Sequence, residues 1–342
     1  MELPVINLNG FLQEKENLSS SEQDCRKLAN VLRQYGAAAI YDPRVEQQDN
    51  ESFLNMMERY FEQPTEVKLE DARPQLYYQV GVTPEFTEQP RDNSVYAKKL
   101  LPEHKPTAFK GKDCKWRFQW RIGERSESSK YPELVSEPVV PRGFPDWPSI
   151  MNKWGEKLLA TGFTIAEMLA IGLDLPRDAF LRLLAKGSHL LAPTGVDIDR
   201  YEKGHVVAGF HYDLNFLTLH GKARYPGLFI WTREGIRIPC KVPDGCLLVQ
   251  VGAQLEYLTA GYLEKGFHEV VITEELKQKA KQGNQSHWRV SSTLFVHVEA
   301  DAILEPLGHF QHLELAKQNY VPTEAGAQVA QELYAIQLAQ NI

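Results

Sequence analysis

The sequence predicts a mainly β protein with flanking helices, and three observations lead to this fold class. From Leu190 to Val298, short apolar runs alternate with Gly, Pro and Asn, as in proteins built from many short strands. Residues 115–122 alternate apolar and polar side chains, which is the period of a strand. Residues 148–173 carry apolar side chains at helical spacing. Short strands at this density favour a double-stranded β-helix, or jelly roll, as the core.

The elements before and after this core are expected to be mixed. In chain order they are a strand at 5–8, a helix at about 20–35, a strand at 37–41, a helix at about 50–61, helices at 148–173 and 178–185, and a last helix from Pro322–Glu324 to about Gln340. Residues 71–114 read as irregular because prolines interrupt them. We therefore divide the chain into an α/β region at 1–114, a jelly-roll core at 115–310 and a helical segment at 311–342.

The two faces of the strand at 115–122 have opposite chemistry. One face carries Trp116, Phe118, Trp120 and Ile122, and the other carries Lys115, Arg117, Gln119 and Arg121. The aromatic face is expected to pack in the core, with contact to a substrate as the alternative. The arginines are expected in solvent unless an acidic ligand binds them.

Composition excludes several classes of partner. The chain has 342 residues and a net charge of −7, without a Lys/Arg-rich run, which argues against a nucleic-acid partner. No apolar run approaches the roughly 18 residues of a membrane span, and Met1–Pro4 does not open a signal peptide. The four cysteines lack C-x-x-C spacing, as in reduced proteins. These features predict a cytoplasmic protein.

Three residues form a candidate metal site. His211 and Asp213 lie in Gly-Phe-His-Tyr-Asp, and His268 lies in Lys-Gly-Phe-His-Glu-Val-Val. Each follows or enters a run with strand-like composition. Two imidazoles and one carboxylate that leave the other positions of a metal open are typical of non-heme Fe(II) oxygenases. The spacing therefore predicts iron ligands.

A second pair predicts a carboxylate anchor. Arg289 and Ser291 are two residues apart in a strand-like run, so their side chains point to the same side. A guanidinium and a hydroxyl so placed can hold a carboxylate through charge-assisted contacts. A metal beside a carboxylate anchor indicates oxidative chemistry driven by a 2-oxo acid.

These residues and their surroundings resemble the isopenicillin N synthase-like branch of the Fe(II)/2-oxoglutarate-dependent dioxygenases. The resemblance also covers Leu3–Leu8, Arg33–Ala37, Tyr60–Lys68, Leu217–Leu219, Tyr225–Leu228, Asp244–Gly252 and Leu258–Gly261. It implies that His211, Asp213 and His268 bind Fe(II). It also implies that Arg289 and Ser291 hold the C5 carboxylate of 2-oxoglutarate, with Tyr201 touching the same co-substrate.

The resemblance implies an activity and leaves two alternatives open. The activity is O2-dependent hydroxylation, desaturation or cyclisation of a small metabolite, with release of succinate and CO2. One alternative is an Fe(II)/O2 oxidase of the isopenicillin N synthase or aminocyclopropane-carboxylate oxidase type, which does not use 2-oxoglutarate. The other is a metal-binding jelly roll without turnover.

Departures from the family pattern leave the substrate open. Glu269 follows the distal histidine where the family usually has Arg, and Glu202–Gly204 replaces a proline-rich run. Thr273–Leu276 opens like a capped helix, so an inserted surface helix is expected before His287. The expected substrate is a small, carboxylate-bearing metabolite, because Arg117, Arg121 and Arg200 are the cations that could meet it. The remaining histidines, including His205 and His220, are expected to be rim or sheet residues rather than ligands.

Overall fold

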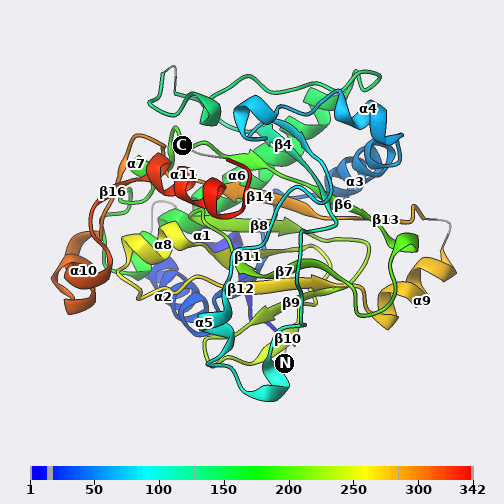
Figure 1. Ribbon diagram of the computed structural model, residues 1–342. Helices are drawn as coiled ribbons and strands as arrows, with labels where there is room; N and C mark the ends of the chain where they lie inside the picture. Colours follow the sequence, from blue (N-terminus) through cyan, green and yellow to red (C-terminus); the bar gives the residue numbers. More distant parts are fainter. Residues whose placement is uncertain (1, 14–17, 127, 284, 340–342) are drawn as a thin grey trace.

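Two β-sheets form the centre of the molecule in the computed structural model, which describes residues 2–13, 18–126, 128–283 and 285–339 (Figure 1). The major sheet has the strand order β1 (Val5–Asn7), β2 (Ala37–Tyr41), β11 (Cys246–Val251), β8 (Leu217–Gly221), β14 (Ser292–Val296), β5 (Leu190–Leu191), β4 (Trp116–Arg121), β6 (Thr194–Asp197) and β13 (Trp288–Val290), with β3 (Gly81–Thr83) beside β4. The minor sheet has the order β10 (Arg237–Pro239), β9 (Leu228–Trp231), β12 (Phe267–Val271) and β7 (Val206–Tyr212). Side chains of both sheets line one cavity between them, so the predicted jelly roll is confirmed.

The first segment of the chain contributes directly to the major sheet. Strand β1 pairs in parallel with β2, and β2 pairs antiparallel with β11, with Ala39 opposite Leu248. Ile6 and Ile40 belong to the same buried cluster as Leu219 and Leu294 of the jelly roll. The buried cluster continues across residues 114 and 310, so it does not divide the chain at either position. The three-part division of the chain therefore stays a prediction.

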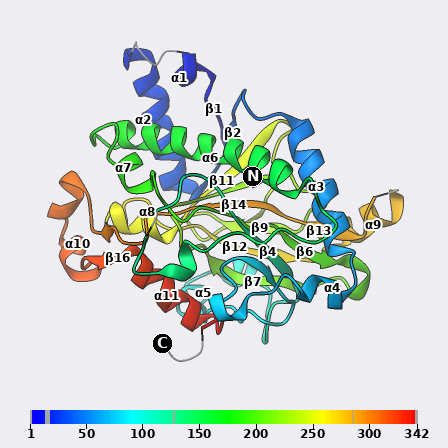
Figure 2. The ribbon, with the colours of Figure 1, turned by 90° about the horizontal axis from the view of Figure 1, so that it is seen from above.

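Three long helices cover the outer face of the major sheet. They are α2 (Leu18–Tyr35), α3 (Gln47–Phe61) and α6 (Trp147–Gly172). Figure 2 shows them together on one side of the strands, with α11 on the other side. Helix α6 buries Trp154, Leu158 and Ile165 at the helical spacing that predicted it.

The shorter elements differ from expectation in places. The shorter helices are α1 (Asn9–Gln13), α4 (Thr65–Leu69), α5 (Ser94–Ala97), α7 (Leu181–Leu184), α8 (Ala253–Leu258), α9 (Glu274–Gln282), α10 (Glu314–Asn319) and α11 (Ala325–Ala335), and β15 (Ile303–Leu304) pairs with β16 (Thr323–Glu324). The last helix therefore begins later than predicted, because Thr323 and Glu324 pair with β15 instead. It ends at Ala335, since Gln337 has a left-handed backbone with φ 62°, and Gln340 lies outside the described residues.

The two faces of β4 separate core from cavity. Trp116, Phe118 and Trp120 are at most 3% exposed and belong to the main core, which confirms the core interpretation of this face. Beneath them lies Lys68, which is 2% exposed. Its ammonium lies 4.1 Å from the ring centroid of Trp116 and 4.6 Å from that of Trp288, and it donates a hydrogen bond to Phe61 O at 2.8 Å.

Titration of Lys68 should make the free energy of unfolding depend on pH in the alkaline range. Burial lowers the pKa of Lys68 from 10.5 to about 8, so the unfolded chain holds more protons than the folded chain between these values. Stability therefore rises with pH in this window. We expect the wild type to gain up to about 3 kcal/mol of unfolding free energy relative to Lys68→Met between pH 8 and 10.5. Denaturant titrations of both proteins across this range measure the difference, and a difference that stays constant with pH would contradict the assignment.

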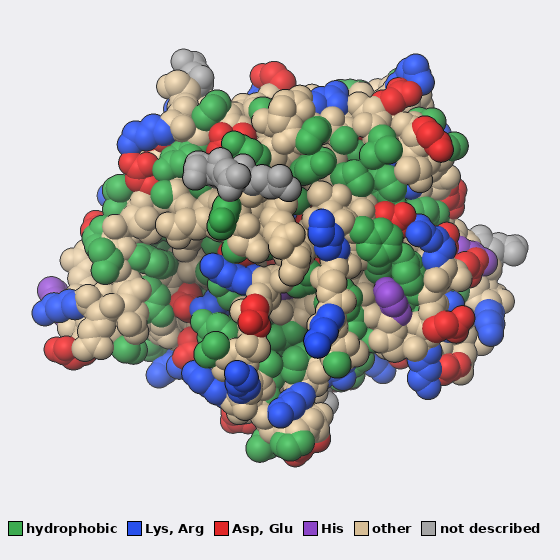
Figure 3. Space-filling view, in the orientation of Figure 1, with side chains coloured by type: hydrophobic (Ala, Val, Ile, Leu, Met, Phe, Trp, Pro, Cys, Tyr) green, Lys and Arg blue, Asp and Glu red, His purple; other side chains and the backbone are tan. Residues whose placement is uncertain are grey.

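The exposed surface has the mixed charge that the amino-acid composition indicates. On the face seen in Figure 3, Lys and Arg side chains are interspersed with acidic and apolar ones. None of the described helices combines the length and the apolar character needed to cross a bilayer. All four cysteines are free thiols.

Candidate metal centre and active site

The three predicted metal ligands meet between two strands of the minor sheet. Strands β7 and β12 pair antiparallel with His268 directly opposite His211, which places the two ring centroids 4.2 Å apart. Asp213 follows the end of β7, and its Oδ1 lies 3.8 Å from His211 Nε2 and 3.9 Å from His268 Nε2. Ligand atoms of all three residues lie within 4.8 Å of one another, which is close enough to bind one ion.

Hydrogen bonds orient two of these ligands, His211 and Asp213, for a metal. His211 Nδ1 donates to Gly209 O at 2.6 Å, which leaves the lone pair of Nε2 free. Thr218 donates to Asp213 Oδ2 at 2.7 Å, so Oδ1 faces the two imidazoles. Burial, reinforced by His211, lowers the pKa of His268 to about 3, so its ring is neutral as metal binding requires. Two neutral imidazoles and a carboxylate fit an Fe(II) ion.

The predicted carboxylate anchor lies in the same cavity as this triad. The cavity between the sheets measures about 320 Å³ and is lined by His211, Asp213, His268, Arg289 and Ser291. Arg289 is 5% exposed and donates through Nε to Pro226 O at 2.9 Å. Among the described residues no carboxylate pairs with it, and burial lowers its pKa to about 10. A buried guanidinium without a counterion is suited to an acidic ligand.

Two threonines, Thr194 and Thr293, and His220 complete this cavity, and sequence reasoning did not place them there. Ser291 Oγ accepts from Thr194 N at 2.9 Å and lies 3.3 Å from Thr293 Oγ1. His220 hydrogen-bonds Thr293 Oγ1 at 3.0 Å and Gln250 Oε1 at 3.3 Å. His220 is therefore a cavity residue held outside the metal cluster, consistent with its expected place on a sheet face. No motif marks Thr194, Thr293 or His220 as cavity residues, because they come together only through strand pairing.

Tyr201 lies elsewhere. Its ring stacks on His205 with centroids 4.3 Å apart and packs against a small cluster that includes Val196 and Val207. It is not among the residues that line the cavity of Arg289. Its contact with a co-substrate therefore stays a prediction that this geometry does not support.

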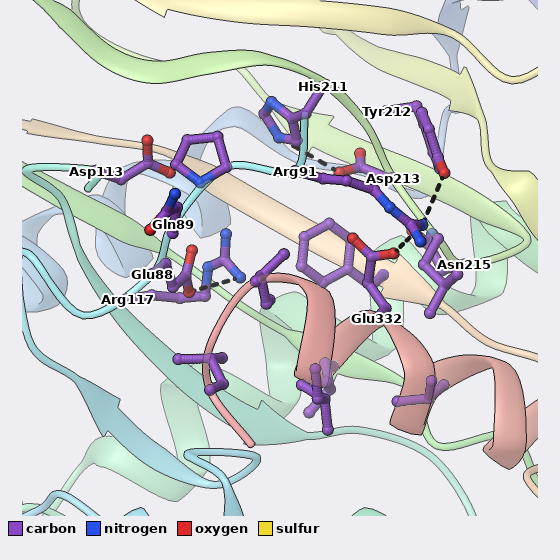
Figure 4. A pocket seen from close by; sticks show the side chains of 18 of the residues that line it. Glu88, Gln89, Arg91, Asp113, Arg117, His211, Tyr212, Asp213, Asn215 and Glu332 are labelled. Atoms are coloured by element: carbon purple, nitrogen blue, oxygen red, sulfur yellow. Dashed lines mark hydrogen bonds and ion pairs between the residues drawn. The ribbon is translucent and has the colours of Figure 1, made fainter. Parts of the chain in front are cut away.

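A second cavity meets the first at His211 and Asp213. It measures about 140 Å³ and lies between β4, β7 and α11 (Figure 4). Lys115, Arg117 and Phe295 line both cavities. Helix α11 contributes Val329, Glu332 and Leu333 to its wall.

The three arginines considered for an acidic substrate have different surroundings. Arg117 lines both cavities, but its Nη1 lies 2.9 Å from Glu88 Oε1. Arg121 is buried and donates to the backbone carbonyls of Ser188, Gln79 and Glu133, so its expected place in solvent is wrong. Arg200 is half exposed and bound to Glu85. Only Arg117 is therefore near the triad, and it already has an acidic partner.

The departures after the distal histidine have structural explanations. The predicted insertion forms helix α9, with Leu276 N donating to the Thr273 hydroxyl at 3.1 Å. Glu269 is fully buried and accepts from Arg237 Nε at 2.9 Å, from Thr107 N at 3.0 Å and from Thr107 Oγ1 at 3.0 Å. Glu269 thus ties the irregular segment around Thr107 to the strand that carries His268.

Replacing Glu269 should lower the stability of the fold. We expect Glu269→Ala to lower the free energy of unfolding by about 3 kcal/mol, because it leaves the Arg237 guanidinium and the Thr107 amide without their acceptor. The matched control is Glu264→Ala, which breaks the exposed pair with Arg233 and should cost less than about 1 kcal/mol. Urea denaturation of the two variants compares them, and equal losses would contradict the role of Glu269.

Comparisons with known proteins agree with this fold and site. Residues 198–298 match the 2OG-Fe(II) oxygenase superfamily. Kihadalactone A synthase of Citrus sinensis is 28% identical over 172 residues, covering 48% of each chain. A 2-oxoglutarate-dependent dioxygenase of Aspergillus rugulosus is 28% identical over 175 residues, covering 49% of this chain and 51% of its own. The chain thus spans about half the length of these curated relatives.

Solved structures share the fold over the whole chain. A 2OG-Fe(II) oxygenase family protein from Caulobacter crescentus superposes with a TM-score of 0.78 at 21% identity, covering 98% of this chain and 99% of that one. A Neurospora crassa protein solved in complex with alpha-KG and thymine gives 0.75 at 19% identity, covering 97% and 96%. The fold is that of a double-stranded β-helix, and the segment matched by the family contains all three candidate ligands and both anchor residues. Residues 198–298 are thus similar to the 2OG-Fe(II) oxygenase superfamily.

Proposed function

We propose that this protein is an Fe(II)- and 2-oxoglutarate-dependent dioxygenase that oxidises a small molecule. The observation that carries the proposal is one cavity holding both a His–Asp–His set and the unpaired, buried guanidinium of Arg289. Bound Fe(II) would use O2 and 2-oxoglutarate to oxidise the substrate, with release of succinate and CO2. The expected placement in the isopenicillin N synthase-like branch and in the cytoplasm belongs to this proposal.

The protein residues would have separate tasks. His211, Asp213 and His268 would hold the metal, with Gly209 O orienting His211 and Thr218 orienting Asp213. Arg289 and Ser291 would hold the far carboxylate of 2-oxoglutarate in the larger cavity. The smaller cavity, which also reaches His211 and Asp213, would then remain for the molecule to be oxidised.

Two observations bear on the substrate. The Neurospora crassa neighbour was solved with thymine, which is consistent with a small molecule at this fold. The expected carboxylate group on the substrate rested on Arg117, Arg121 and Arg200, and each of these guanidiniums already has protein partners. We therefore propose a small-molecule substrate that does not need a carboxylate group.

The experiment is to measure succinate formed and O2 consumed by the Fe(II)-loaded protein, with and without 2-oxoglutarate. Even without the substrate, slow succinate formation that requires 2-oxoglutarate and disappears in Asp213→Ala supports the proposal. O2 consumption independent of 2-oxoglutarate would instead indicate the oxidase alternative. Metal binding without either reaction would indicate a non-catalytic jelly roll.

A further inference from the structure

The smaller cavity contains charged side chains that are already paired with one another. Glu88 bridges two cations, with Oε2 2.8 Å from Lys115 Nζ and Oε1 2.9 Å from Arg117 Nη1. Lys115 also contacts Asp113. The four side chains are between 5% and 16% exposed, so two acids and two bases compensate each other away from solvent. Figure 4 shows the Glu88–Arg117 pair beneath His211.

The remaining charges at the cavity are paired as well. Arg91 Nη1 lies 2.7 Å from Glu332 of α11 and donates to the Tyr212 hydroxyl at 3.1 Å (Figure 4). Apart from the candidate ligand Asp213, every charged side chain among the described residues of this lining has an opposite charge beside it. A carboxylate that entered would lose its hydration without gaining a free cation, which costs several kcal/mol.

Neutral amides in the same lining have unsatisfied atoms. Gln119 is 3% exposed and its Oε1 has no hydrogen-bond partner, while Asn215 is 1% exposed and its Nδ2 has none. Gln119 reaches the cavity because it shares the face of β4 with Arg117, and Asn215 lies two residues beyond Asp213. An unpaired buried polar atom costs about 1–3 kcal/mol, so a ligand that pairs both atoms recovers this energy. Leu190, Phe295 and Leu333 supply apolar contact around them.

We propose that this cavity selects an uncharged substrate that carries an amide-like group, with an N–H donor and a carbonyl acceptor on an apolar body, over the corresponding carboxylic acid. The inference rests on the proposed function only in taking the neighbouring triad as the reaction centre. The charge network of Glu88, Lys115, Arg117 and Asp113 determines this selectivity. Its two cations are already paired with acidic side chains, so they are not free to bind an acidic ligand.

Binding of matched amide and acid pairs tests the proposal. The probes are nicotinamide with nicotinate, benzamide with benzoate, and phenylacetamide with phenylacetate, titrated into protein loaded with Zn(II) and 2-oxoglutarate and followed by ligand-observed NMR. We expect the wild type to bind at least one amide at least about tenfold more tightly than its acid. Leu333→Trp, which fills the cavity, should abolish that binding.

Two glutamate variants locate the selectivity. Glu88→Gln releases Arg117, while Lys115 keeps its contact with Asp113, and should shift the amide-to-acid preference by at least about tenfold toward the acid. Glu85→Gln, which removes the partner of Arg200 outside the cavity, should leave the preference unchanged. The proposal is overturned if acids bind as tightly as amides in the wild type, if no probe binds at millimolar concentration, if Leu333→Trp still binds, or if Glu88→Gln keeps the wild-type preference. Succinate formation is not part of this readout, so the proposed function can fail or hold independently.

Discussion

Replacing His211, Asp213 or His268 by alanine is expected to abolish turnover and to weaken binding of Fe(II) by about a hundredfold or more. The three ligand atoms lie within 4.8 Å of one another, so each variant leaves only two donors. The loss should exceed the roughly 10–100-fold cost typical of changing only a residue that supports a ligand. Anaerobic calorimetric titration of Fe(II) into each purified variant measures it directly.

The fold should survive these substitutions, and this separates the role of a ligand from a structural role. Circular dichroism and the unfolding midpoint of the metal-free variants should stay near those of the metal-free wild type. His312→Ala is the matched control, because His312 is exposed and outside both cavities. It should bind Fe(II) like the wild type. Wild-type affinity in any of the three alanine variants would remove that residue from the proposed metal site.

Arg289→Ala is expected to raise the Kd for 2-oxoglutarate by about 30- to 4000-fold. Truncating one side of a buried, hydrogen-bonded charge pair costs about 2–5 kcal/mol, and Arg289 is 5% exposed with no carboxylate partner among the described residues. Arg289→Lys should recover only part of the affinity, since lysine keeps the charge but lacks the planar fork. Titration of 2-oxoglutarate into the metal-loaded protein gives these constants.

Two further variants sharpen this measurement. Ser291→Ala should weaken 2-oxoglutarate binding by about 10- to 100-fold, because it removes one hydrogen bond from an uncharged donor to the carboxylate. Arg200→Ala removes an exposed arginine paired with Glu85 and should change nothing. If Arg289→Ala binds 2-oxoglutarate as the wild type does, the anchor lies elsewhere, or the protein belongs with oxidases that do not use this co-substrate.

Local patterns were sufficient to predict much of the fold. The long helix α6 follows from apolar spacing, α9 from the Thr273 cap, and the two faces of β4 from strict alternation. The start of α11 was misplaced because Thr323 and Glu324 pair with a strand that is distant in sequence. Pairing of this kind leaves no periodic signal in the segment itself.

The candidate site also has a part that local patterns predict and a part that depends on tertiary packing. His211, Asp213, His268, Arg289 and Ser291 were found because each belongs to a short motif, and the structure places all five around one cavity. The network of Glu88 with Lys115 and Arg117 could not be predicted, since Glu88 lies in an irregular segment whose path depends on tertiary packing. Tyr201 stacks on His205 outside the lining of this cavity, and its contact with the co-substrate stays a prediction.

The two cavities draw on different parts of the chain, and this has an evolutionary consequence. Apart from Lys115 and Arg117, the lining of the larger cavity comes from residues 192–295. The smaller cavity takes much of its lining from residues 79–93 and from α11 with the residues that follow it. Mutations in these flanking segments can therefore change which molecule is admitted without disturbing the proposed metal centre. An arrangement of this kind allows substrate preference to diverge while the metal site is retained, which is consistent with a family match over residues 198–298, the segment that contains the candidate ligands.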